Sequence, residues 1–152
     1  MSIEKEKDLW RDTPIRYLGY ANECGEAFRP LMPRFVRPSY AVAFGYVLGD
    51  TGSKTLKSKE AKNEDTEVAK TALDCFVWQT LASVMIPGLV INRVTSTSAQ
   101  IMNTNVKLLS SLPSPLKRFG PTMIGLMTIP LIIHPIDNGV TWFMDNTARK
   151  WW

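Results

Sequence analysis

Histidine and cysteine are scarce in this 152-residue chain, which contains one histidine, His134, and two cysteines, Cys24 and Cys75. The cysteines lie far apart, form no C-x-x-C motif and do not combine with the histidine at the spacing of metal ligands. We therefore expect neither a disulfide framework nor a metal site. The chain also lacks G-x-S-x-G and H-E-x-x-H motifs, so the sequence contains no recognisable catalytic constellation and we expect no catalytic residues.

Acidic residues are absent between Arg93 and Arg118, although this stretch contains Lys107 and Lys117. The whole chain has a formal net charge of +4 and an isoelectric point of about 9.2. A nucleic-acid partner would require a basic face with stacking aromatics or a recognition motif, and we find neither. Anionic membrane lipid is therefore the partner that we expect for this charge, and we expect no nucleic acid.

Long apolar blocks occur despite an unremarkable mean hydropathy of −0.08. Residues 75–91 carry no charge, and residues 119–136 have His134 as their only titratable side chain. A third block, residues 35–51, has a short apolar run, from Tyr40 to Leu48, and includes the charged residue Arg37. Three helices this apolar are hard to bury in one small soluble chain, so we expect them to be candidate membrane spans. Whether the chain has two or three spans stays open at this point.

The block at residues 35–51 also contains small residues at every fourth position, Ala41, Gly45 and Gly49. This spacing predicts a helix face that another helix can approach closely, in an oligomer or with another membrane protein. Residues 51–70 are rich in Lys and Glu and predict a solvated, mobile connector. In the second block, Gln79, Thr80 and Ser83 are expected to form hydrogen bonds across helices, and Pro87 and Gly88 to disturb the helix near its end.

Residues 13–29 predict an amphipathic helix, capped by Thr13 and started by Pro14. Its apolar side is formed by Ile15, Leu18, Ala21 and Phe28, whereas Arg16, Glu23, Glu26 and Arg29 are expected to face water. Two interpretations remain: a surface helix on a soluble core, or an interfacial helix lying in a membrane surface. Downstream, Trp142, Phe143, Trp151 and Trp152 are aromatics typical of the headgroup level.

The stretch around His134 is expected to be a turn at the membrane edge, because Pro135 disfavours a helical conformation at the residue before it. Asp137 would then cap the next helix. We favour this structural role for both residues over a proton-linked or catalytic role, although an ionisable group inside a membrane is a functional hypothesis by default.

The sequence therefore predicts an all-α fold in one domain, residues 1–152: a small multi-pass membrane helical bundle with amphipathic interfacial helices. The start, "MSIEKEKDLWRD", contains Glu4 and Glu6 and is typical of neither a secretory signal nor an acid-poor presequence. We expect any organelle address to be internal. With three spans, the positive-inside rule would place the amino terminus and the Arg93–Arg118 connection together on the inner side of the membrane, and with two spans this assignment would not hold.

Several stretches, "RYLGYANE", "GEAFR", "FVWQ", "LASV", "IPG", "INRV" and "TIP" followed by "IIHPID", resemble the mitochondrial fission process protein family in order and spacing. The resemblance extends from Leu9 to Lys150. It implies an integral, multi-pass protein of the mitochondrial inner membrane that supports fission and membrane organisation, without enzyme activity or cofactor. The family positions carried onto this chain are Arg16, Tyr17, Gly19, Tyr20, Asn22, Glu23, Gly25, Glu26, Phe28, Arg29, Trp78, Gln79, Pro87, Gly88, Asn92, Arg93, Pro130, His134, Pro135 and Asp137.

Other function classes remain open beside this one. A small accessory subunit of an inner-membrane respiratory assembly is the main alternative, and its partners would be other inner-membrane proteins. A transporter with Gln79, His134 and Asp137 as a polar path ranks third, and a soluble helical enzyme ranks last.

Overall fold

The computed structural model describes residues 7–104 and 106–151, so Glu4, Glu6 and Trp152 lie outside the described part. Within that part all regular elements are helical, which confirms the predicted all-α fold. In chain order the elements are η1 (Pro14–Tyr20), α1 (Ala21–Ala27), η2 (Pro33–Phe35), α2 (Val36–Glu60), α3 (Asp65–Gln79), η3 (Thr80–Met85), α4 (Ile86–Met102), α5 (Lys107–Ser110), α6 (Ser114–Asn146) and η4 (Ala148–Lys150).

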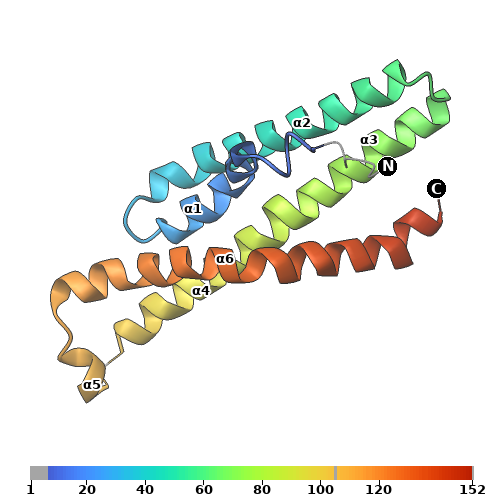
Figure 1. Ribbon diagram of the computed structural model, residues 1–152. Helices are drawn as coiled ribbons and strands as arrows, with labels where there is room; N and C mark the ends of the chain where they lie inside the picture. Colours follow the sequence, from blue (N-terminus) through green and yellow to red (C-terminus); the bar gives the residue numbers. More distant parts are fainter. Residues whose placement is uncertain (1–6, 105, 152) are drawn as a thin grey trace.

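Three long helical stretches lie side by side and alternate in direction (Figure 1). α2 and α3 form a hairpin, α3 continues through η3 into α4, and α6 returns along α4. α1 packs against α2, α4 and α6, and η1 packs against α2. The α2–α3 turn and α5 lie at opposite ends of the bundle (Figure 1). The Arg93–Arg118 connection therefore lies at the end of the bundle opposite the α2–α3 turn, and the membrane orientation expected for three spans stays a prediction.

Residues 51–70 are helical rather than a mobile connector. α2 runs on through Asp50 and Gly52 to Glu60, and α3 begins at Asp65. The turn between them contains Lys62 with a φ of 57°. Lys, Glu and Ala are strong helix formers, and a polar sequence made of them forms a helix when it can pair with a second one. The polar composition therefore predicted exposure correctly and irregular structure wrongly.

Two helical stretches of the described chain are long and apolar enough to cross a membrane, Asp65–Met102 and Ser114–Lys150. They contain the predicted spans 75–91 and 119–136. The third predicted span, residues 35–51, belongs to α2 and does not meet the same criteria. Its uncharged stretch from Pro38 to Gly49 is only about 18 Å long at 1.5 Å per residue, shorter than the ~30 Å hydrocarbon layer.

α6 continues through three prolines, Pro121, Pro130 and Pro135, so the predicted turn at His134 is wrong. Asp137 does not cap a new helix, because it lies well inside α6. A proline inside a helix removes one hydrogen bond and crowds the preceding turn. Apolar helices that pack against neighbours tolerate this, because their remaining backbone bonds and contacts hold the helix together.

Pro87 is accommodated differently. It lies in the first turn of α4, directly after the π-helical turn η3. Proline lacks a backbone amide hydrogen, but amides in the first turn of a helix have no partner within that helix anyway. The π turn η3 shifts the register of the backbone hydrogen bonds just before Pro87. The expected disturbance near Pro87 and Gly88 is therefore a π turn that precedes them within one continuous helical stretch.

The amphipathic segment at residues 13–29 faces the opposite way from the prediction. Thr13 does cap η1, with its side chain accepting from the Ile15 amide at 3.4 Å. However, Arg16, Glu23 and Glu26 are buried, whereas Leu18 is exposed. Three of the four polar residues therefore pack into the bundle, whereas Arg29 is exposed as predicted, and of the apolar side Leu18 faces outward while Ile15 packs against the core.

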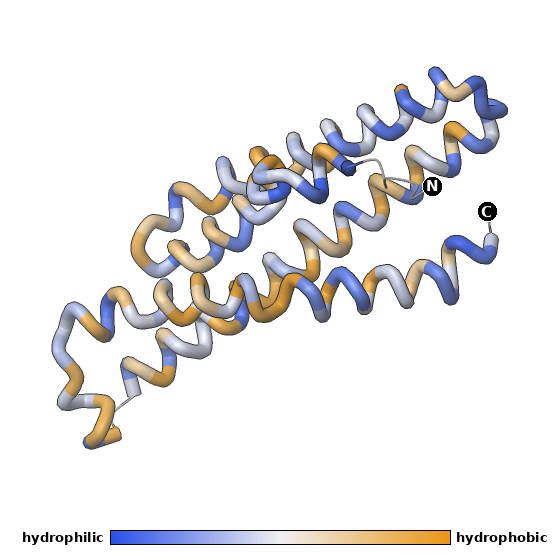
Figure 2. Tube along the Cα trace, viewed as in Figure 1, coloured by the Kyte–Doolittle hydropathy of each residue, from blue (hydrophilic) through white to orange (hydrophobic). Residues whose placement is uncertain are grey.

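Apolar side chains face outward elsewhere as well. α6 exposes Phe119, Met123, Met127 and Leu131, which lie four residues apart along one face. Figure 2 shows the apolar colour spread over the middle of the bundle and α5, while polar residues gather at the α2–α3 turn and the end of α6. The buried apolar residues form three small clusters, centred on Val47 in α2, Met144 in α6 and Ile91 in α4.

Gly88 provides a test of the packing between α4 and α1. A Cβ atom at this position would lie 2.6 Å from Tyr40 Oη and 2.8 Å from Asn22 Nδ2. We expect Gly88→Ala to lower the free energy of unfolding in detergent micelles by about 1–3 kcal/mol, because it overfills a packed site. Gly52→Ala is the control: nothing lies within 4 Å of that position, so a gain of up to ~1 kcal/mol is expected from helix propensity. Equal effects of the two substitutions would contradict this packing.

Candidate functional site

Arg16 lies at the centre of a buried polar network that joins η1, η3 and α6. Its Nη1 donates to Ser83 Oγ at 2.8 Å, and its Nη2 lies 3.6 Å from Asp137 Oδ2. The guanidinium carbon lies 4.6 Å from the centre of the Tyr20 ring. A buried guanidinium is stable only when opposite charge and hydrogen-bond acceptors surround it, and these three elements supply them.

The network continues from Arg16 toward the charged end of the bundle. Ser83 Oγ donates to Gln79 Oε1 at 2.6 Å, and Gln79 Nε2 donates to Asp50 Oδ2. Asp50, which is fully buried, also accepts from Lys54 Nζ at 2.6 Å. Side chains from four elements thus form an unbroken series of polar contacts from the middle of the bundle to its end.

Lys54 connects this series to the amino-terminal segment, because its Nζ lies 3.1 Å from Asp8 Oδ2. The same segment is held by Trp10, whose carbonyl accepts from the Tyr46 hydroxyl and whose ring meets that of Tyr46 edge-on at 5.6 Å. Arg11 lies over the Trp78 ring at 4.3 Å. Asp8, Trp10 and Arg11 therefore hold this short segment against α2 and α3.

Two glycines leave the space that these polar side chains occupy. A Cβ atom at Gly19 would lie 2.9 Å from Arg16 Nη1 and from the Tyr46 ring. A Cβ atom at Gly88 would meet Asn22, whose Nδ2 donates to the Val84 carbonyl at 2.8 Å. Small residues at these two points let η1 and α1 approach the other helices closely.

Glu26 forms a second polar cluster, between α1, α2 and α4. Its carboxylate accepts from Arg29 Nε at 2.7 Å, from the Tyr40 hydroxyl at 2.9 Å and from Asn92 Nδ2 at 2.9 Å. Burial alone would raise the pKa of Glu26, but these bonds outweigh it and hold the pKa below its usual value. Glu26 is therefore a compensated buried carboxylate.

Glu23 is buried without such compensation. Both of its carboxylate oxygens are inaccessible and neither has a hydrogen-bond partner in the described part of the chain. Burial raises the pKa of Glu23 to about 8, and the nearby positive charge of Arg16 offsets only part of this effect. Glu23 is the one carboxyl group outside the two long apolar stretches whose pKa is brought close to physiological pH among the described residues.

The structure brings many of the family-motif positions together. Arg16, Glu23, Gln79 and Asp137 lie in or beside the central network, and Asn92 binds Glu26. Trp78 donates from Nε1 to Thr141 Oγ1 at 2.9 Å. The supporting positions Gly19, Asn22, Gly25, Pro87 and Gly88 are buried, and Tyr20 is partly buried.

Other predicted positions lie at the surface instead. Tyr17 is 71% exposed. Arg93, His134 and Pro135 are also exposed. The motif "RYLGYANE" thus contains both buried residues, such as Arg16 and Glu23, and residues that face outward, such as Tyr17 and Leu18.

The sequence reasoning missed Asp50, which it placed at the end of the candidate span 35–51, and Lys54, which it assigned to the connector 51–70. A usable pattern was present, because Tyr46, Asp50 and Lys54 are four residues apart and therefore share one face of a helix. The expectation for Gln79 and Ser83 is met, since both form hydrogen bonds to other elements. Thr80 has no hydrogen-bond partner for its buried hydroxyl among the described residues.

The small residues of α2 do not share one environment. Gly49 packs against Trp10, which a Cβ atom at this position would meet at 2.5 Å. Ala41 and Gly45 are exposed, and nothing in the described structure lies within 4 Å of a Cβ atom built at Gly45. Contact with another helix at Ala41 and Gly45 therefore stays a prediction about association between chains.

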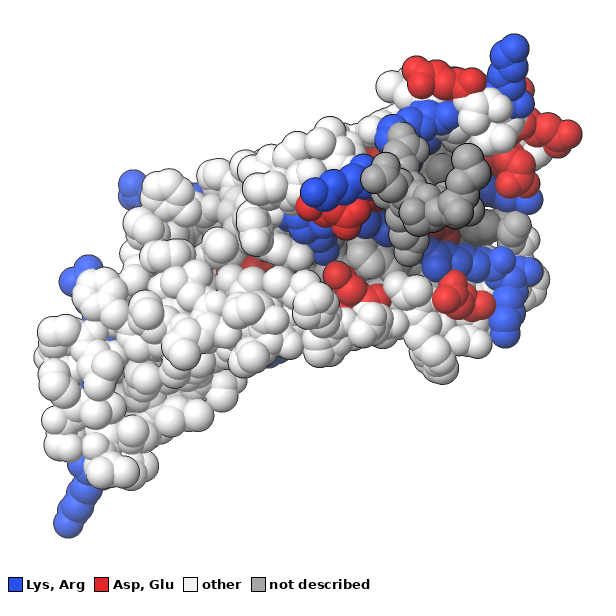
Figure 3. All heavy atoms as spheres, viewed as in Figure 1, with Lys and Arg blue, Asp and Glu red and all other residues white. Residues whose placement is uncertain are grey.

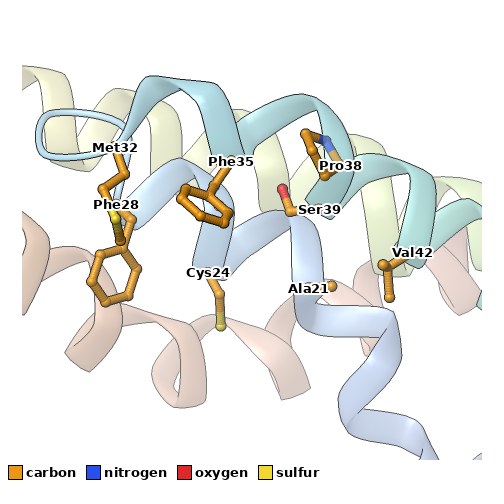
Figure 4. A pocket seen from close by; sticks show the side chains of 9 residues that line it. Ala21, Cys24, Phe28, Met32, Phe35, Pro38, Ser39 and Val42 are labelled. Carbon is orange, nitrogen blue, oxygen red and sulfur yellow. The ribbon is translucent and has the colours of Figure 1, made fainter.

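An apolar groove opens between α1 and α2 (Figure 4). Its side chains come from Cys24, Phe28, Met32, Phe35 and their neighbours, and it encloses about 330 Å³. The Ser39 hydroxyl at its edge donates to the Val36 carbonyl at 2.6 Å. No cluster of three metal-ligating side chains occurs among the residues that the structure describes.

These features define a class of protein: a helical bundle that buries polar networks beside small apolar clusters, exposes many large apolar side chains and has two helical stretches in its described part long enough to cross a membrane. Comparison with known proteins agrees with this class. The family model described as "Mitochondrial 18 KDa protein (MTP18)" matches residues 10–75 and 64–144, and the chain belongs to this family.

Curated relatives are similar over nearly the whole chain. A protein of Caenorhabditis elegans named "Mitochondrial fission process protein 1" is 48% identical over 151 residues, which cover 95% of this chain and 89% of the relative. The protein of the same name from Homo sapiens is 46% identical over 150 residues, covering 95% and 88%. No solved structure matches this chain.

Arg16 is expected to be a major source of stability. Arg16→Met should lower the free energy of unfolding in detergent micelles by about 3 kcal/mol, because it leaves Asp137 and Ser83 without their partner. Lys70→Met is the matched control: Lys70 pairs with Glu67 at the surface, and its loss should cost less than about 1 kcal/mol. Asp137→Asn in the Arg16→Met background should recover part of the loss. No recovery, or equal costs of the two Met substitutions, would contradict a buried charge pair.

Glu23 is expected to make stability depend on pH. Because its folded-state pKa is raised to about 8 from the ordinary value of about 4.5, the folded chain holds this proton more tightly than the unfolded chain. The stabilisation is complete below pH 4.5 and is lost as the pH rises toward 8. The unfolding temperature of the wild type should therefore fall between pH 5 and pH 8, and that of Glu23→Gln should fall less. Glu67→Gln, at an exposed position, should behave as the wild type.

Proposed function

We propose that this chain is a non-enzymatic integral protein of the mitochondrial inner membrane that supports mitochondrial fission and the organisation of that membrane. The observation that carries the proposal is the inverted distribution of its side chains. Ten polar or charged residues are buried, among them Arg16, Glu23 and Asp50. An apolar solvent around the bundle makes this arrangement favourable, since polar groups then gain most by pairing with one another inside.

The two long apolar stretches support the membrane location. Only 28% of the most apolar part of Ser114–Lys150 is buried within the chain, whereas the core helix of a water-soluble protein is mostly buried. The exposed row from Phe119 to Leu131 supplies a lipid-facing surface on this helix. Residues 119–136 extend about 27 Å, close to the thickness of the hydrocarbon layer.

The charges also support this location. Most charged side chains on the face shown in Figure 3 gather over the α2–α3 turn and the end of α6, and the other half is nearly uncharged. No acidic residue occurs from residue 27 to 49 or from residue 75 to 136. The end that contains α5 therefore carries only basic charge, contributed by residues such as Lys107, Lys117 and Arg118. This end suits contact with anionic lipid.

The role in fission rests on the relatives, whose printed name is "Mitochondrial fission process protein 1". Two features could act in such a role. The buried network fixes η1 and α1 as a rigid wedge between α2 and the α4–α6 pair. The exposed Ala41–Gly45 face of α2 offers a contact for another copy or for another inner-membrane protein.

The location can be tested by carbonate extraction of mitochondria after rupture of the outer membrane. We expect the chain to stay in the inner-membrane pellet, and release into the supernatant would overturn the proposal. The fission role can be tested by expressing the chain in cells that lack their own relative and measuring network length. An unchanged network, together with stoichiometric co-purification with a respiratory complex, would favour an accessory subunit instead.

Association through α2 gives a sharper test. Gly45→Leu should reduce crosslinked oligomers or complexes several-fold, because its side chain would separate two closely packed helices. Gly52→Leu is the matched control, since it lies on the same helix and also has nothing within 4 Å of its Cβ position. Both substitutions should leave the unfolding temperature nearly unchanged. Complexes that survive Gly45→Leu would show that this face is not the contact.

A further inference from the structure

A surface groove that shares Arg16 with the buried network lies between the start of η1 and the middle of α6. It encloses about 480 Å³. Its walls come from two segments far apart in the chain. Residues from Arg11 to Tyr20 form one side, and residues from Pro130 to His134 form the other. Tyr17 and His134, two exposed family positions that are not part of the buried network, both line this groove.

Hydrogen-bond donors dominate the polar side of this groove. Arg11 and Arg16 bring two guanidinium groups, and Tyr17 and Tyr20 bring two phenolic hydroxyls. Arg16 forms the buried floor: its side chain is only 10% exposed, and its Nη2 has no hydrogen-bond partner within the described chain. The one carboxylate of the lining, Asp12, already accepts from the Asp8 amide at 2.9 Å. This donor set suits an anionic oxygen-rich group such as a phosphate.

The other side of the groove is apolar and lies at a boundary. Pro130 and Ile133 precede His134, and α6 turns from uncharged to charged at Asp137. Met127 and Leu131, close to them in the sequence, belong to the exposed apolar row of α6. Figure 2 shows the same change of hydropathy along α6. In a bilayer this level is that of the headgroups and the glycerol backbone.

We propose that this groove binds the phosphate of a membrane phospholipid, with Arg11, Tyr17 and His134 around the headgroup and the acyl chains along the exposed row of α6. The proposal rests on the membrane location proposed above. A phospholipid fits better than free phosphate, because only a lipid also covers Pro130, Ile133 and the apolar row beside them. The bound lipid would join the amino-terminal segment to α6 from outside, opposite the contact that Arg16 makes inside.

The single histidine makes the proposal measurable. In the full-length chain, labelled with ¹³C-histidine in detergent micelles, His134 gives one imidazole resonance. Dihexanoyl phosphatidylglycerol should shift this resonance saturably. Dihexanoylglycerol, which has the same tails and no phosphate, should not shift it, and inorganic phosphate should bind at least ~10-fold more weakly because it cannot cover the apolar wall. A shift with dihexanoylglycerol, or none with the phospholipid, would overturn the site. Equal affinity for inorganic phosphate would assign the groove to free phosphate instead.

Matched variants separate the groove from general charge or hydrophobicity. Arg11→Gln should weaken phospholipid binding about 10-fold, as expected for one charge-assisted hydrogen bond. Arg34→Gln removes the same charge at a distant exposed site and should leave binding unchanged. Tyr17→Ala should weaken binding several-fold, whereas Trp142→Ala, at a side chain that is similarly exposed at 68%, should not. Equal effects within either pair would overturn the assignment.

Carbonate extraction of the same proteins distinguishes the two proposals. Release of the wild type from membranes would contradict the membrane location. Retention of the wild type and of Arg11→Gln, together with a His134 resonance that ignores the phospholipid, would contradict the headgroup site alone.

Discussion

Burial of the Arg16 guanidinium is the constraint on which the arrangement of this bundle depends. A charge this deep must be matched by acceptors and an opposite charge, and these come from Ser83 in η3 and Asp137 in α6. The first of these partners lies in a π-helical turn and the second in a helix that continues through Pro135. The docking of η1 therefore fixes the relative depth of both long apolar stretches. Gln79, Asp50 and Lys54 then extend the same polar contacts to the charged end.

Apolar packing has a smaller part in this chain than in a typical water-soluble bundle. The three buried clusters are small, and they are separated by polar side chains. Specificity comes instead from directional contacts and from close approach at glycine, as at Gly19 and Gly88. Hydrogen-bonded groups inside a membrane protein are worth no more than about 1–2 kcal/mol each, so the network acts through the number of its members.

The sequence predicted the all-α fold and both helical stretches of the described chain that are long and apolar enough to cross a membrane, because a long uncharged block can be recognised from the local sequence alone. It also predicted the buried roles of Gln79 and Ser83. It was wrong about Arg16, Glu23 and Glu26, since an amphipathic pattern shows that a helix has two faces but does not show which face is covered. It was wrong about Pro135, because helix breaking is a local tendency that neighbouring helices can override. Asp50 was missed because its partners, Lys54 and Gln79, come from two helices whose pairing cannot be inferred without the hairpin.

Both ends of the described chain are tied to the same hairpin. Asp8 meets Lys54 of α2, and Arg149 binds Asp74 of α3 with its Nε at 2.6 Å from Oδ1. The path between these anchors descends and returns twice through the bundle, as Figure 1 shows. Because this path passes along the bundle an even number of times, both described ends lie beside the α2–α3 turn, whereas the α1–α2 turn and α5 lie toward the opposite end. A tag fused at either end would therefore lie near the same turn of the protein.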